Sequence, residues 1–304
     1  MPSAASFMTL QGKTNKQRSR RAAHAGKKRR AMRTVTQEEM KQIMLAMLVD
    51  FDAFCRSHQL RYCLIGGTLL GAVRHHGYIP WDDDVDVAMP RQDYEQFAAL
   101  YNTEKTNPDF TFASYHQIPK LYVSSGKLYD TRTVLKEYCD SDVQIGVYLD
   151  IFPLDNIGKT REEAEAFSKE ALKYRKRLTR RTWMVNVPGR AWYKNCAVAV
   201  LKLFSTHQPV AQLVKEQDDF CSSRRSRDLE PYVSIVCDAL KPEILEGAWF
   251  DTYIEMPFEG HSFFVPSGYD QVLTAMYGNY MQLPPVEQRV THHSYDVWYR
   301  DEEK

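Results

Sequence analysis

IGGTLLGAVRHHGYIPWDDDVDVAM, at residues 65 to 89, carries most of the information on architecture and chemistry in this 304-residue chain. Two glycines end an apolar run, a helix-forming stretch of small residues follows, and four aspartates then fall within five positions, at 82, 83, 84 and 86. Like charges this close repel one another, and burying them unpaired is expensive. A divalent cation such as Mg²⁺ removes both problems, because it binds carboxylate oxygens and brings phosphates with it. The cluster therefore predicts a metal site.

The aspartates lead into a strand that we predict over Trp81 to Met89. Side chains alternate between the two faces of a strand, so Asp82, Asp84 and Asp86 share one face while the valines between them face the core. Carboxylates two positions apart start about 7 Å apart at the backbone, which lets Asp84 and Asp86 converge on one or two ions. Asp83 points the other way, and we expect it to brace the turn. The alternative interpretation is an acidic, solvated turn.

Gly66 and Gly67 form the other half of the predicted site. The apolar run at 62–65 is expected to be a short buried strand, after which the glycines let the backbone approach a ligand closely. Thr68 is expected to cap the helix that follows. A glycine turn into a helix start binds anions through its N–H groups and the helix dipole, and Arg74 adds a charged donor nearby.

The longer string GGTLLGAVRHHGYIPWDDDVDVAMPRQDY, at 66–94, resembles the LicD family, whose relatives include the fukutin-type sugar-phosphate transferases. Its glycine turn, helix and Asp-x-Asp strand are similar to the active-site layout of the nucleotidyltransferase fold. VYLDIFPLDNIG at 147–158 is similar to the second acidic motif of the family. YDQVLTAMYGNYMQLPP at 269–285, followed by Arg289 and the histidines at 292 and 293, is similar to its C-terminal motif.

This resemblance implies an α+β fold, in which a nucleotidyltransferase-like mixed sheet is flanked by helices and a helical insertion at 160–228 follows the second acidic motif. It implies a phosphotransferase that moves phosphocholine, or a similar phospho-alcohol, from a CDP-activated donor such as CDP-choline. The acceptor would be a hydroxyl of a cell-surface glycan or glycolipid, as in lipopolysaccharide or teichoic acid modification, and CMP would be released. The implied cofactor is Mg²⁺, with Mn²⁺ as the alternative.

Asp150 is the expected third acidic group of the site. It stands in a predicted buried strand at 146–152, where a carboxylate needs a partner. With the layout of the fold, this assigns Asp84, Asp86 and Asp150 as catalytic residues and metal ligands. The alternative for Asp150 is a purely structural, hydrogen-bonded carboxylate. Asp155, which follows Pro-Leu, is expected to be a turn residue.

Cationic side chains complete the expected phosphate site. Lys127, within the strands predicted over 110–136, is a candidate for the pyrophosphate of the donor, and the alternative is an exposed lysine on an edge strand. The resemblance adds Arg289 and His293, with His292 beside it, as candidates for phosphate contacts, and His76 as a group that orients an aspartate or a phosphate. The expected substrate-binding set is Gly66, Gly67, Thr68, Arg74, His76, Lys127, Arg289 and His293.

Charge is distributed unevenly along the chain. Residues 1–37 hold ten Lys or Arg and no acid, whereas the rest holds 30 basic and 39 acidic residues, a net charge of −9. We predict a disordered basic tail over 1–35 and a catalytic domain over 36–304. The tail would contact an anionic membrane surface, act as a nucleic-acid arm, or simply be solvated; no stable nucleic-acid partner is expected.

Other features of the sequence limit where the protein acts and how it folds. No run approaches the ~18 apolar residues of a membrane span, and the N-terminus has no apolar signal segment, so we expect a cytoplasmic protein that can lie peripherally at the inner face of the membrane. Six cysteines without a C-x-x-C pair are expected to be reduced thiols. Helices are expected at 36–58, 91–101, 161–187, 191–205, 207–222 and 266–280.

Two alternatives to the phosphotransferase stay open. A nucleotidyltransferase that moves NMP from an NTP would use the same aspartates. A non-catalytic membrane- or nucleic-acid-binding protein would not need them. The basic helices of the insertion are either a solvated surface or a docking face for an anionic acceptor or the membrane that carries it.

Overall fold

The fold is built around a mixed β-sheet, and the order of the strands in this sheet brings the two acidic motifs together. The computed structural model describes residues 33–137, 139–141, 143–187, 190–237, 243–289 and 295–300. The sheet runs in the order β1 (Cys63–Leu64), β2 (Asp86–Pro90), β6 (Tyr148–Gly158), β4 (Gly126–Asp130) and β3 (Phe110–Ala113). β2 and β6 are parallel and the other pairs are antiparallel, while β7 (Tyr232–Ser234) and β8 (Leu245–Glu246) continue from the second half of β6. The predicted α+β class with a mixed sheet is confirmed.

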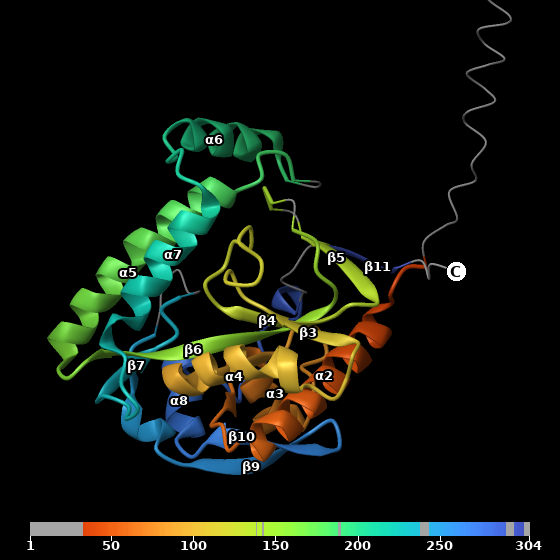
Figure 1. Cartoon of the computed structure of the whole chain (residues 1–304), viewed down its shortest axis with the longest axis vertical. Helices are drawn as coiled ribbons and strands as arrows, with labels where there is room; N and C mark the ends of the chain where they lie inside the picture. The colour runs from red at the N-terminus through yellow and green to blue at the C-terminus, as the bar shows by residue number, and fades with distance from the viewer. Residues whose placement is uncertain are drawn as a thin grey trace, which may run out of the picture.

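Two helices, α2 (Gln37–Ser57) and α4 (Arg91–Glu104), pack against one face of this sheet (Figure 1). α2 begins where predicted, because Thr36 accepts a hydrogen bond from the N–H of the third helical residue in a capping box. Its stripe of Met, Leu and Phe side chains is buried in the main core. The rings of Phe51 in α2 and Phe97 in α4 meet edge to face at 5.0 Å, so the two helices share one aromatic layer.

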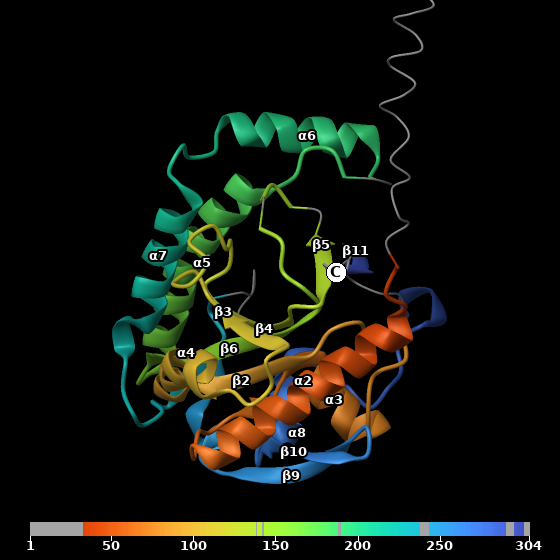
Figure 2. The same ribbon diagram turned by 45° about the vertical axis from the view of Figure 1, so that its right-hand side comes forward.

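A second group of elements lies around the start of β2 (Figure 2). α3 (Gly66–His75) contacts β2, α8 (Tyr269–Tyr277) and β9 (Tyr253–Phe258). β9 forms a hairpin with β10 (His261–Pro266), and β10 contacts β1. These contacts fix the N-terminal end of α3 beside the acidic segment before β2.

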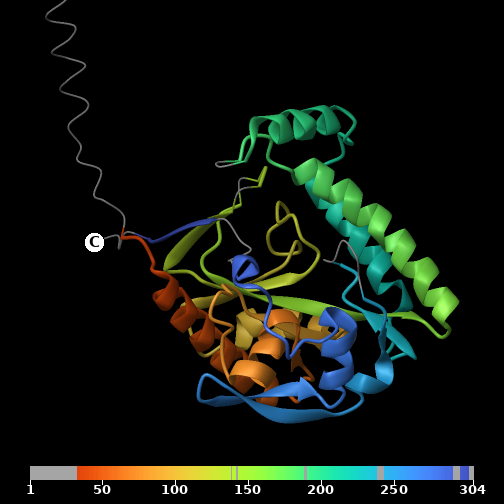
Figure 3. The same ribbon diagram turned by 180° about the vertical axis from the view of Figure 1, so that it is seen from behind.

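The predicted helical insertion is confirmed. α5 (Arg161–Thr182) and α7 (Val210–Cys221) lie side by side, and α6 (Trp192–Leu203) lies across their ends, far from the β9–β10 hairpin (Figures 1 and 3). α5 ends before the predicted Val187, because Trp183 leaves the helix and forms an antiparallel bridge with Cys139. Among the residues that the structure describes, no helix is both long and apolar enough to cross a membrane.

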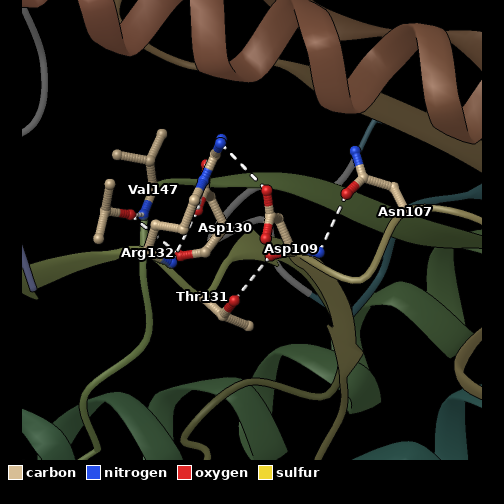
Figure 4. A network of polar contacts seen from close by, with 7 residues as sticks. Asn107, Asp109, Asp130, Thr131, Arg132 and Val147 are labelled. Carbon is tan, nitrogen blue, oxygen red and sulfur yellow. Dashed lines mark hydrogen bonds and ion pairs between the residues drawn. The ribbon is translucent and has the colours of Figure 1, made fainter. Parts of the chain in front are cut away.

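A polar network closes the turn between β4 and β5 (Thr133–Glu137) (Figure 4). Asp130 is fully buried and accepts hydrogen bonds from the backbone N–H (2.8 Å) and the guanidinium of Arg132, which also pairs with Asp109 at 3.1 Å. The Thr133 hydroxyl accepts from the N–H of Val147 at 2.8 Å. The turn therefore holds β4 in fixed register against β6.

The end of the described chain returns to this region. β11 (Tyr295–Tyr299) pairs with β5, and Thr34 bridges to Trp298, while Val35 is buried and its N–H bonds to Val297. The folded part of the chain thus includes residues 34 and 35.

Two local predictions around the acidic motif were wrong. The strand starts at Asp86 and not at Trp81, because the N–H of Asp82 closes a turn onto the carbonyl of Ile79. Thr68 does not cap α3, which already begins at Gly66. Its hydroxyl is instead buried and accepts a hydrogen bond from the N–H of Asp86 at 2.9 Å. Thr68 therefore ties α3 to the first residue of β2.

Asp155 was also predicted wrongly, since it lies within β6 and not in a turn. It is 1% exposed and pairs with both nitrogens of one edge of Arg91, at 2.6 and 2.7 Å. Burial raises the pKa of Asp155 to about 6, and the Arg91 guanidinium opposes that rise. Arg91 also donates to Asp218 of α7 at 2.9 Å. The pair thus joins the central sheet to the insertion.

Candidate active site

Three of the four clustered aspartates open into one cavity. Asp82, Asp84 and Asp86 are half-buried and line a cavity of about 390 Å³ together with Gly67 and Arg74. The alternation predicted for these side chains holds, although Asp82 and Asp84 precede the strand. It arises from the extended segment that runs into β2.

Asp83 does not line this cavity and is 5% exposed. The hydroxyl of Tyr295, from β11, donates to its carboxylate at 2.8 Å. A residue from the end of the chain therefore braces the acidic segment from behind, which agrees with the structural role expected for Asp83.

The carboxylates of the acidic segment carry like charges and repel one another. One carboxylate oxygen of each of Asp82, Asp83 and Asp84 lies within 4.8 Å of the others. Burial, and next the charge of Asp84, raise the pKa of Asp82 to about 7. A hard divalent cation relieves this repulsion and takes carboxylate oxygens as its preferred ligands. The residues present therefore fit a Mg²⁺ or Mn²⁺ ion.

The glycines at the start of α3 lie directly against these carboxylates. A Cβ at Gly67 would come 2.4 Å from the carboxylate oxygen Oδ2 of Asp82, and one at Gly66 would come 3.0 Å from Oδ2 of Asp86. Gly66 also has a φ of 59°, a conformation that L side chains rarely adopt. The backbone conformation at Gly66 thus requires glycine, and at Gly67 a side chain would displace the Asp82 carboxylate from the helix start.

Asp150 lies beside Asp86 but has a different environment. The two residues are in register on the parallel strands β2 and β6, and Lys127 is in register with Asp150 on β4. Lys127 Nζ donates to Oδ1 of Asp150 at 2.9 Å and lies 3.4 Å from the ring centre of Tyr148. Asp150 is not among the residues that line the 390 Å³ cavity. The structure thus places Asp84 and Asp86 in the cavity and Asp150 on the adjacent strand, paired with a lysine.

Lys127 is not the exposed edge-strand lysine of the alternative interpretation. It is 5% exposed, on a strand with neighbours on both sides. Glu137 also approaches its ammonium group, at 3.9 Å. A lysine this buried needs its acidic partners.

Two predicted arginines come together near the cavity although they are far apart in sequence. Arg74 lines the cavity and donates to the carbonyl of Tyr280 at 2.7 Å. Its pKa is lowered by burial and by the nearby charge of Arg289. The guanidinium of Arg289 lies over the ring of Trp81 at 5.4 Å.

The predicted His76 does not lie in the cavity. It is exposed at the C-terminal cap of α3, in a left-handed conformation. His293 and its neighbour His292 lie outside the described residues.

Sequence reasoning missed an aromatic wall on the same cavity. Trp81, Tyr277 and Tyr280 all line it. Tyr277 is 45% exposed, and the pKa of its hydroxyl is raised by partial loss of solvent and then by the charges of Asp86 and Asp82. These residues stand inside the motifs quoted above, but only the fold shows that they share one cavity.

Comparison with known proteins points to the family that the motifs resemble. A model of the LicD/FKTN/FKRP nucleotidyltransferase domain matches residues 59–191, which hold both acidic motifs and Lys127. The chain is 28% identical over 273 residues to the lipopolysaccharide cholinephosphotransferase LicD of Haemophilus influenzae, covering 88% of this chain and 99% of that protein. An uncharacterized protein of Rickettsia typhi is 34% identical over 91 residues, 29% of this chain and 28% of that protein. The resemblance drawn from the motifs is confirmed.

Proposed function

We propose that this chain, which contains a LicD-family nucleotidyltransferase domain, transfers phosphocholine from CDP-choline to a hydroxyl of a cell-surface glycan and releases CMP. The transferred group could instead be a phospho-alcohol similar to phosphocholine. The name of the Haemophilus relative suggests lipopolysaccharide as the acceptor. The observation that carries the proposal is one cavity that combines three aspartates, a glycine-started helix and an aromatic wall.

Asp84 and Asp86 are the residues we propose to hold Mg²⁺, with Mn²⁺ as the alternative and Asp82 as a further oxygen donor. Bound there, the ion would neutralise the charge of the phosphates of the donor. Asp150, beside Asp86 on the next strand, is our candidate for a further metal ligand or for the base.

The start of α3 is the proposed cradle for phosphate oxygens. The first N–H groups of a helix have no partner within the helix, so those of Gly66, Gly67 and Thr68 can donate to a phosphate. Arg74 faces the same cavity, and Arg289 is close enough to lower its pKa. Two guanidinium groups that repel each other would both be favoured by an anion placed between them.

The reaction is an in-line displacement at the phosphorus that carries the choline. The hydroxyl oxygen of the acceptor forms the new P–O bond, the bond to the bridging oxygen of the donor breaks, and its electron pair leaves on CMP. In the proposed role as base, Asp150 takes the hydroxyl proton. Lys127 holds the Asp150 carboxylate at 2.9 Å and thereby orients it. Positioning and charge neutralisation supply most of the acceleration in such transfers.

The aromatic wall supports choline over an uncharged alcohol. A quaternary ammonium group is attracted to the faces of Trp and Tyr rings, and carboxylates nearby add to that attraction. Tyr277 and Tyr280 line the cavity together with the aspartates, while Arg289 already covers one face of Trp81. Ribitol and glycerol carry no charge that these rings would recognise.

A thermal-shift screen tests the choice of donor. The purified chain is heated with Mg²⁺ and CDP-choline, CDP-ribitol or CDP-glycerol, with and without EDTA. We expect the largest metal-dependent rise in melting temperature with CDP-choline, a smaller rise in Tyr277→Leu and a retained rise in Tyr277→Phe. Equal shifts with all three donors, unchanged in Tyr277→Leu, would show that the wall does not select choline.

A nucleotidyltransferase is the second candidate, because the matched domain carries that description and the same aspartates would serve an NTP. Its released product would be pyrophosphate and not CMP. We further propose a cytoplasmic enzyme that works peripherally at the inner face of the membrane, where a lipid-linked acceptor would be reached.

A further inference from the structure

α6 exposes its large apolar side chains and does not bury them against the rest of the protein. None of its residues is buried. Its large apolar residues are instead strongly exposed: Trp192 76%, Tyr193 58%, Val200 54% and Leu203 79%, followed by Phe204 at 79%. A helix that merely covers a protein core shows the reverse pattern.

The periodicity assigns these side chains to one face. Positions 192, 196, 200 and 203 recur at helical spacing, and positions 193, 197 and 204 lie next to them. The less exposed face is mixed, with Asn195, Val198, Ala199 and Lys202, and Lys202 forms an ion pair with Asp140. α6 therefore contacts the rest of the chain through this mixed face and presents its largest apolar side chains outward.

The position of α6 leaves this apolar face accessible. It lies across the ends of α5 and α7, at the end of the molecule opposite the β9–β10 hairpin (Figures 1 and 3). In the described part of the chain, no residue of another element buries it.

The sequence around α6 is rich in cations, although Asp140 from outside this stretch pairs with Lys202 and approaches Arg181. Residues 171–215 hold ten Lys or Arg and no Asp or Glu. Several of these cations belong to α5, whose C-terminal end lies near α6, and Lys194 is exposed on α6 itself. An apolar face with Trp and Tyr, surrounded by basic residues, matches the chemistry of an anionic bilayer surface.

We propose that the face formed by Trp192, Tyr193, Val200, Leu203 and Phe204 docks on an anionic lipid bilayer. The helix would lie in the plane of the interface, with these side chains among the lipids and the basic residues at the headgroups. A second copy of the chain fits this face less well, because the two basic surroundings would repel each other. The inference rests on the peripheral membrane location proposed above, for which it names the docking surface, and does not depend on which group is transferred.

Vesicle flotation with the full chain tests it. The vesicles are phosphatidylcholine alone or phosphatidylcholine with about one third phosphatidylglycerol. We expect binding to the anionic vesicles, little binding to phosphatidylcholine alone, and a loss of about ten-fold or more in the variant Trp192→Glu, Leu203→Glu. The matched control is Ile254→Glu, which charges an exposed apolar residue (43%) on β9 and is expected to bind like wild type. Unchanged thermal unfolding shows that both variants fold.

Three results would overturn the proposal. The first is full vesicle binding by the double variant. The second is wild-type binding that depends only on residues 1–32 and disappears on their deletion. The third is a dimer by light scattering that the double variant dissociates, with no vesicle binding by wild type. Turnover of a soluble donor and acceptor is measured in parallel and is expected to be equal in wild type and double variant, so failure here is distinct from failure of the proposed chemistry.

Discussion

Asp86 and Asp150 are direct neighbours, in register on the parallel strands β2 and β6, although 64 positions separate them in the chain. On the other side of β6, Lys127 is in register with Asp150 and bonds to it at 2.9 Å. The sheet thus places two carboxylates and one ammonium group side by side on three neighbouring strands. The loop before β2 adds Asp82 and Asp84 to one end of this row.

Loss of either cavity aspartate should remove activity without unfolding the chain. Asp84→Asn and Asp86→Asn are each expected to lower turnover by about 10³-fold, since these carboxylates are the proposed metal ligands. Both are half-buried at the cavity and outside the apolar core, so circular dichroism should be unchanged. Asp251→Asn, an exposed surface acid, is the control. Unfolding of both cavity variants would show that these residues are structural.

The pairing of Lys127 with Asp150 should be visible in stability. Lys127→Met removes the cation that bonds Asp150 and is expected to cost about 3 kcal/mol in urea unfolding, because it strips a buried pair of one partner. The double variant Lys127→Met, Asp150→Asn should recover most of that stability and stay inactive. If the double variant is no more stable than Lys127→Met, the two residues do not act as a pair.

The buried triad of Arg91, Asp155 and Asp218 should hold the insertion to the sheet. Arg91→Met leaves two acids without their guanidinium and is expected to lower the free energy of unfolding by about 3–5 kcal/mol. Arg225→Met, which breaks an exposed pair with Glu95, should change it by about 0.5 kcal/mol or less. Similar effects of the two substitutions would refute a structural role for the triad.

Much of this arrangement could be predicted from the sequence, because local signals agree with the fold. The cap at Thr36, the Met stripe of α2 and the alternation at Asp82, Asp84 and Asp86 each depend on neighbours a few positions away. The domain matched by comparison covers the same motifs.

The errors come from partners that are distant in sequence. Thr68 looks like a cap, but its hydroxyl bonds to the N–H of Asp86, 18 positions on. Asp155 looks like a turn residue after Pro-Leu, yet Arg91, 64 positions away, pairs with it inside β6. The aromatic wall joins Trp81 to residues near the other end of the chain, and no local pattern indicates that contact.

The acidic cluster should make stability depend on pH when metal is removed. The pKa of Asp82 is raised to about 7 in the folded state, so between its ordinary value and pH 7 the folded chain binds a proton that the unfolded chain has released. Stability in EDTA should therefore fall as pH rises from 5 to 8, by about 1 kcal/mol after allowance for partial solvation. Asp82→Asn should remove this fall, and urea midpoints across the pH range measure it. A pH dependence identical in the variant would assign it to other groups.

The basic tail should not be needed for the chemistry. Deletion of residues 1–32 leaves Thr34 and Val35, which the structure ties to β11. Turnover on a soluble acceptor is therefore expected to stay within about two-fold of wild type. A complete loss of turnover on that acceptor would mean that the tail contributes to the site.

Identification of the reaction products tests the proposed phosphocholine transfer. The purified chain is incubated with Mg²⁺, choline-labelled CDP-choline and a soluble lipopolysaccharide oligosaccharide, and the nucleotide and glycan products are separated by chromatography. We expect equal amounts of CMP and labelled glycan, with both lost in EDTA and in Asp84→Asn. Pyrophosphate release from an NTP, with no CMP formed from CDP-choline, would contradict it.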